Sequence, residues 1–206
     1  MIAVSTYGWF TPRCAAGRLK HPLREVNRTF RFNEDRMPTD GPIQPGQIVS
    51  VASLQGLRDV APSLDAGTWV MYDIEGWAFT PTEEKDAPQA SMRRFVTLAR
   101  EMGFRAMLAP AAKWRDRAAR LPADAFLAQV QNIVDPDQYG AKVCELNRRF
   151  RGRYFYAELT ARHLSAQRML LQYKAGRACA AGFALWGSRP EHISVLNRFL
   201  TQVKQL

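Results

Sequence analysis

The sequence predicts an α/β domain, a small parallel (β/α) barrel of the TIM type that occupies residues 1–206 as a single unit. Short β-branched and aromatic runs alternate with amphipathic stretches, which is typical of βα units and a parallel sheet. Polar residues also gather at the carboxyl ends of several expected strands, where the active sites of barrels lie. An open doubly wound sheet is disfavoured because no glycine-rich phosphate loop follows any strand.

Seven strands are expected, each short and bounded by Gly, Pro or Asp. They cover residues 2–7, 48–53, 69–75, 105–111, 125–131, 154–160 and 183–187. Residues 11–46 contain charged residues and prolines that interrupt any helix or strand pattern, so no element is assigned there. We therefore leave open a barrel whose first half is incomplete or irregular.

Four amphipathic helices follow the later strands, because apolar residues recur there at helical spacing. The first begins at Pro88 and ends at Gly103, and the last begins after Pro190, a favoured first helical position. The four apolar stripes are Met92, Phe95, Val96, Ala99 and Met102; Tyr139, Val143, Leu146 and Phe150; Ala166, Met169, Leu170 and Tyr173; and Ile193, Leu196, Phe199, Leu200 and Val203.

The composition indicates one globular domain of a cytoplasmic protein. The chain has 206 residues, 47% of them hydrophobic, which is enough for one sizeable core. No run of about 18 apolar residues is present to span a membrane, and the amino-terminal segment MIAVSTYGWF lacks the basic start of a signal peptide. Cys14, Cys144 and Cys179 lack metal-ligand spacing, so we expect reduced thiols.

The net charge of +10 arises from 29 Lys and Arg against 19 Asp and Glu. Such an excess favours an anionic partner, either a small polar or anionic substrate or an acidic carrier protein. The arginines concentrate in residues 13–36 and 148–153, and solvated surface is the plain alternative for both clusters. Nucleic acid is disfavoured as a partner because no RNA-binding sheet motif, zinc finger or basic zipper is present.

The stretch TWVMYDIEGW, residues 68–77, carries the main candidates for catalysis. Side chains alternate along a strand, so Met71, Asp73 and Glu75 share one face, which we expect to line the barrel interior. Residues two apart on a strand are separated by roughly 6.5 Å at Cα. Like charges so close raise the pKa of one partner, which predicts one protonated acid and one carboxylate for acid–base chemistry.

The same alternation on other strands aims further polar and aromatic residues at this place. Glu158 is expected as a third catalytic acid, and the expected substrate-binding residues are Ser5, Tyr7, Trp9, Gln129, Gln131, Tyr156 and Trp186. Structural roles remain open: an arginine partner for Glu158, a loop brace for Asp73, and core packing for the aromatic residues. No metal or other cofactor is expected, because no ligand spacing exists beyond Asp73 and Glu75.

The motif YDIEGW resembles a strand end found in glycoside hydrolase barrels. Family-18 chitinases end a strand with Asp-x-Asp-x-Glu; here Asp73 and Glu75 match the last two acids, while Met71 replaces the first. Family-25 lysozyme-like barrels also carry Asp-x-Glu, and the longer YDIEGWxxTPxxE is similar to uncharacterised bacterial TIM-barrel proteins. The resemblance implies that Glu75 donates a proton and that Asp73 assists it.

These features predict an enzyme that cleaves a C–O bond of a small polar substrate, a hydrolase similar to glycoside hydrolases. The first alternative is a biosynthetic lyase or cyclase that eliminates or displaces sulfate or phosphate, closing a ring on a substrate held by an acidic carrier protein. The second alternative is a non-catalytic module that binds an anion or nucleic acid.

Overall fold

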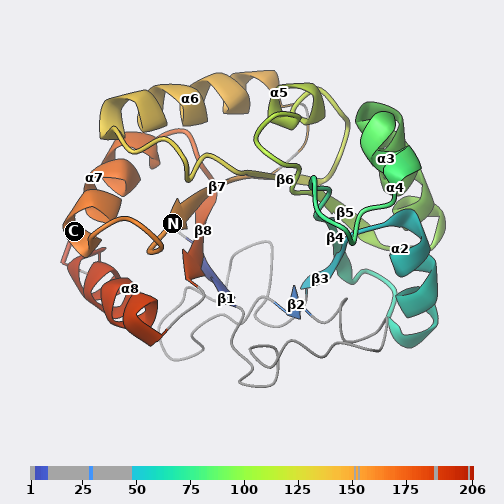
Figure 1. Cartoon of the computed structure of the whole chain (residues 1–206), viewed down its shortest axis with the longest axis horizontal. Helices are drawn as coiled ribbons and strands as arrows, with labels where there is room; N and C mark the ends of the chain where they lie inside the picture. The colour runs from blue at the N-terminus through green and yellow to red at the C-terminus, as the bar shows by residue number, and fades with distance from the viewer. Residues whose placement is uncertain are drawn as a thin grey trace.

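The computed structural model describes residues 3–8, 28–29, 48–150, 152, 154–187, 190–203 and 205–206. Its strands form one sheet in the order β1-β8-β7-β6-β5-β4-β3-β2 (Figure 1). The strands are β1 (Ala3–Gly8), β2 (Arg28–Thr29), β3 (Ile48–Val51), β4 (Trp69–Tyr72), β5 (Arg105–Leu108), β6 (Ala125–Ala128), β7 (Tyr154–Thr160) and β8 (Gly182–Gly187).

The sheet is parallel from β1 through β8 to β3, and β2 pairs antiparallel with β3. The predicted α/β class and parallel sheet are confirmed. The sheet curls into a half-barrel, compatible with part of a TIM-type barrel. The expectation of a closed cylinder of parallel strands is wrong for the described residues, because the parallel order stops at β3 and no pairing joins β1 to β2 there.

The helices lie along the outer side of the curled sheet (Figure 1). They are α2 (Leu54–Val60), the short 3-10 helix η2 (Ala61–Ser63), α3 (Thr82–Asp86), α4 (Pro88–Glu101), α5 (Arg115–Ala118), α6 (Pro136–Arg149), α7 (Ala166–Gly176) and α8 (Pro190–Val203). The four predicted helices are confirmed as α4, α6, α7 and α8. The short α2, α3 and α5 were not predicted, since two turns or fewer give little periodicity.

Local chemistry sets the ends of these helices. Helix α4 begins at a proline, and Gly103 follows it with φ of 80°, the left-handed conformation that glycine adopts without strain. The Asp135 carboxylate accepts from the backbone N–H groups of Asp137 and Gln138 and caps α6. The Ser165 hydroxyl caps α7 in the same way.

Apolar residues form two layers, one on each face of the sheet. The outer layer packs the sheet against the helices; Tyr72 stacks on Phe95 of α4 with ring centroids 4.8 Å apart. The inner layer fills the concave side and includes Trp69, Met71 and Leu127. The predicted alternation along β4 is therefore confirmed, with Tyr72 outside and Met71 inside.

Strands β4 and β6 are shorter than predicted, and the acids lie just beyond a strand end. Strand β4 ends at Tyr72 and β6 ends at Ala128. Backbone pairing nevertheless continues: Asp73 N–H donates to Val51 O at 2.9 Å, and Ala111 N–H donates to Ile74 O at 2.8 Å. Because the extended pairing persists, side chains beyond the strand still alternate between the two faces.

The expectation of reduced thiols is wrong for two of the three cysteines. Cys144 of α6 and Cys179, in the turn after α7, form a disulfide with their Cα atoms 4.9 Å apart. Helices α6 and α7 pack side by side, which brings these residues together across 35 positions of sequence. Cys14 lies outside the described residues. Among the described helices, none has the length and apolar character that a membrane span requires.

Candidate active site

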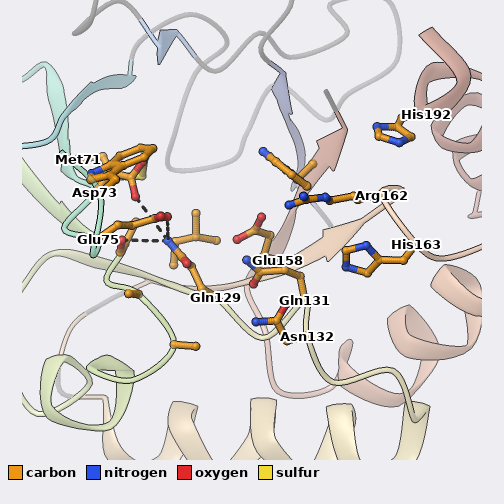
Figure 2. A pocket seen from close by; sticks show the side chains of 16 residues that line it. Met71, Asp73, Glu75, Gln129, Gln131, Asn132, Glu158, Arg162, His163 and His192 are labelled. Atoms are coloured by element: carbon orange, nitrogen blue, oxygen red, sulfur yellow. Dashed lines mark hydrogen bonds between the residues drawn. The ribbon is translucent and has the colours of Figure 1, made fainter. Parts of the chain in front are cut away.

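A cavity of about 770 Å³ opens where the parallel strands end. Asp73, Glu75, Gln129, Gln131, Glu158 and Trp186, all expected from the sequence, line it. They come from the ends of β4, β6, β7 and β8, and Figure 2 shows Asp73 and Glu75 on one side with Glu158 nearer the centre. The cavity thus brings the Glu158 carboxyl group to Asp73 and Glu75, which are distant from it in the sequence.

The amide of Gln129 joins the two acids that follow β4. Its Nε2 lies 2.9 Å from Glu75 Oε1, 3.4 Å from Asp73 Oδ1 and 3.3 Å from the carbonyl oxygen of Ala109. The Arg115 guanidinium donates to the backbone oxygen of Gln129 at 3.1 Å and fixes this segment. Gln129 therefore bridges the two acids and fixes their side chains relative to each other.

Thr80 fixes the loop that follows Glu75. Its hydroxyl accepts from the Glu75 backbone N–H at 3.3 Å and from the Trp77 indole N–H at 3.0 Å. Trp77 lines the cavity. The threonine of YDIEGWxxTPxxE therefore positions one catalytic candidate and one aromatic face.

The last acid of that motif, Glu84, serves the scaffold on the outer side of the sheet. Its buried carboxylate accepts from the backbone N–H of Leu54, at 3.0 Å and 3.2 Å for the two oxygens, and from the hydroxyl of Tyr72. Burial and this carboxylate both raise the pKa of Tyr72, which stays protonated as the donor. Glu84 thereby ties α3 to β4 and to the start of α2.

Glu158 is buried, with 5% of the residue exposed, as is Asp73, with 2% exposed. Burial is the largest cause that raises the pKa of Glu158 well above the ordinary value, and the charges of Asp73 and then Glu75 raise it further. The Tyr139 hydroxyl donates to its backbone oxygen at 3.0 Å and holds this part of β7. The ion pairs of the described residues do not include Glu158, so the arginine pairing left open above is not observed. The structure thus favours the protonated form of Glu158, which lies in the same cavity as Asp73 and Glu75.

The opposite side of the cavity carries groups that the sequence analysis did not single out: Arg162, His163 and His192 (Figure 2). The Arg162 guanidinium lies 5.5 Å from the centroid of the Trp186 ring. Its backbone N–H donates to the Thr160 hydroxyl at 3.1 Å. Their position in the sequence was the only signal that could have indicated them. Arg162 and His163 come shortly after the end of β7, and barrel sites gather polar groups at strand ends.

The remaining predicted site residues have different outcomes. Gln131 lines the cavity, and its Oε1 is buried without a hydrogen-bond partner among the described residues. Tyr156 is 4% exposed, packs in the inner apolar layer and is not among the residues that line this cavity, so its substrate contact stays a prediction. The backbones of Ser5 and Tyr7 pair with Ala184 and Trp186, but their side chains lie outside what the structure describes. Trp9 also lies outside it.

Within the described part of the chain, no group of three or more His, Cys, Asp or Glu residues is arranged to hold a metal ion. Neither a protein-family model nor a curated protein matches the chain. The resemblance of YDIEGW to glycoside hydrolases therefore stays a prediction.

Proposed function

We propose that the protein is an enzyme that cleaves a C–O bond of a small polar substrate by carboxylate acid–base catalysis, in the manner of a glycoside hydrolase. One observation carries the proposal: Gln129 donates to Asp73 and Glu75, and burial, followed by the charges of these two acids, raises the pKa of Glu158. A protonated acid beside a carboxylate is the pair that hydrolysis of an acetal uses.

In this proposal Glu158 is the general acid. Its proton passes to the departing oxygen as the C–O bond breaks, which leaves the Glu158 carboxylate and a neutral alcohol. Asp73 and Glu75 stabilise the positive charge that develops at the carbon, and one of them takes a proton from the water that completes the reaction. The resemblance implied Glu75 as donor; we assign the donor role to Glu158 because burial and two neighbouring charges hold its proton.

The rest of the cavity suits a polyhydroxylated substrate. The buried, unpartnered Oε1 of Gln131 is an acceptor for a hydroxyl group, and Asn132 adds an amide nearby on the cavity wall. Trp77 and Trp186 present aromatic surface, which packs against the apolar face of a sugar ring. Amides and aromatic rings around a carboxylate set support a sugar or a related polyol as the substrate.

A panel of aryl glycosides with good and poor leaving groups tests this function. Glu158→Gln should lower the rate about 100-fold or more for poor leaving groups and much less for nitrophenolate, which departs without a proton. Glu83→Gln is the matched control, because Glu83 is exposed on α3 outside the cavity. Equal loss for all leaving groups, or no loss, would exclude Glu158 as the general acid.

A further inference from the structure

The cavity has two chemically different sides. Asp73 and Glu75 form the acidic side, and Arg162, His163 and His192 form the side that faces them across Glu158 (Figure 2). Arg162 and His163 follow β7, whereas His192 belongs to the first turn of α8. Two separate segments thus bring nitrogen donors to one wall.

Arg162 is held in place by its backbone and by an aromatic ring. The Ala161 N–H donates to the Trp186 carbonyl oxygen at 2.8 Å, which joins the loop after β7 to the end of β8. The next N–H, that of Arg162, donates to the Thr160 hydroxyl. The guanidinium then lies over the Trp186 ring, a favourable cation–π contact that leaves its N–H groups available at the edges. The position of this cation is therefore set before any substrate arrives.

No carboxylate neutralises Arg162 within the described residues. The ion pairs recorded there belong to Arg100, Lys142 and Arg149, each with an acid outside the cavity. Inside the cavity, Asp73 and Glu75 accept from Gln129. The Arg162 guanidinium therefore has no paired anion among the described residues. Its fork of N–H donors matches two oxygens of a carboxylate, sulfate or phosphate group.

We propose that this wall is an oxyanion-binding subsite and that the substrate carries a negatively charged group. Its location next to the reacting bond rests on the function proposed above. The anion would bind Arg162, with His163 and His192 beside it and the positive end of α8 adding to the attraction. Asp73 and Glu75 would repel the same anion, so the two sides together fix the direction in which the substrate lies. The substrate class is an acidic sugar or a sulfated or phosphorylated polyol.

Binding measurements test the subsite separately from catalysis. Full-length protein is titrated with sulfate, phosphate, glucuronate and neutral glucose, by calorimetry and by the fluorescence of the tryptophans. We expect at least one of the anions to bind more tightly than glucose, and Arg162→Met to weaken that binding about tenfold or more. Arg198→Met on α8 is the control, because Arg198 is exposed and does not line the cavity. Arg162→Lys keeps the charge but not the forked N–H donors, so its anion affinity should lie between those of wild type and Arg162→Met.

The results distinguish a carboxylate from a sulfate or phosphate ester on the substrate. They also distinguish a failure of the anion subsite from a failure of the general-acid assignment. Tighter binding of glucuronate indicates a carboxylate on the substrate, and tighter binding of sulfate or phosphate indicates an ester. Glu158→Gln should keep the anion binding even where turnover is lost, so a failure of the general-acid assignment leaves this result intact. Wild-type anion affinity in Arg162→Met, or no anion bound more tightly than glucose, would overturn the subsite.

Discussion

The Gln129 side-chain amide donates a hydrogen bond of 2.9 Å to the Glu75 carboxylate, although the two residues are 54 positions apart. They follow β6 and β4, which are separated in the sheet by β5, and both side chains lie on the concave face. The contact exists because parallel strands bring their carboxyl ends to one edge of the sheet. The two acids are thus held by an amide that follows another strand.

Removing this amide should weaken catalysis without unfolding the protein. Gln129→Leu keeps a similar volume and deletes the donor shared by Asp73 and Glu75. A hydrogen bond to a charged group contributes about 1.5–3 kcal/mol, so kcat/KM should fall by about one to two orders of magnitude. Gln138→Leu, at an exposed position of α6, is the control. Equal kcat/KM values for Gln129→Leu and wild type would show that the amide does not support the acids.

Glu158 should make the stability of the protein depend on pH. Its pKa in the folded protein is raised above the value of 4.5 expected of an ordinary glutamate. Below that value both the folded and unfolded states hold the proton. As pH rises, the unfolded state ionises first, so the free energy of unfolding falls by up to about 1.4 kcal/mol per pH unit until the folded pKa is reached.

Glu158→Gln removes this dependence, because glutamine does not ionise. The variant should gain stability relative to wild type between pH 4 and pH 7, and urea unfolding at several pH values measures the difference. A difference that stays constant over this range would mean that Glu158 ionises alike in both states.

Glu84 should matter for stability through the bonds that it accepts. Glu84→Ala leaves the buried Leu54 N–H and the Tyr72 hydroxyl without their acceptor. Each unsatisfied buried polar group costs about 1–3 kcal/mol, so with two such groups urea unfolding should show a loss of at least this size. Glu83→Ala, one position earlier and exposed, should change the free energy of unfolding little. If Glu84→Ala and Glu83→Ala both changed the free energy of unfolding only slightly, the hydrogen bonds accepted by Glu84 would not contribute to stability.

The disulfide should contribute to stability where conditions are oxidising. Cys144 and Cys179 are 35 residues apart, and closing a loop of this length stabilises a fold by about 3–4 kcal/mol in the chain-entropy description. Replacing both cysteines by serine should lower the midpoint of urea unfolding, and mass spectrometry of the intact protein tests the bond itself. Two free thiols at these positions in protein purified without reductant would contradict the disulfide and support the predicted reduced state.

Much of the concave face could be predicted from the sequence because alternation is a local property. Met71, Asp73 and Glu75 keep one face through backbone pairing, and Gln129 and Gln131 line the same cavity after the end of β6. Long helices such as α4 and α8 were also predictable from their apolar stripes. Periodicity did not distinguish Tyr156 from Glu158, because both lie on the same face of β7. Their positions along the strand differ: Tyr156 lies in the inner apolar layer, and Glu158 lies further along, at the cavity.

Other features depend on contacts that no local pattern carries. Arg162 and His163 follow a strand in a turn without periodicity, and only the packing of β7 beside β8 brings the guanidinium onto Trp186. The role of Glu84 required the unpredicted helices α2 and α3. Likewise, the cysteine pair required α6 and α7 to lie side by side. The choice of Glu158 over Glu75 as proton donor depends on burial, which sequence spacing does not measure.

The raised pKa of Glu158 can be measured by a carbon-13 NMR titration of the glutamate carboxyl groups, with Glu158 assigned through Glu158→Gln. We expect Glu158 to titrate well above 4.5, and Asp73→Asn combined with Glu75→Gln to lower its pKa while burial keeps it above that value. A Glu158 that titrates near 4.5, and does so equally in the double variant, would rule it out as the proton donor.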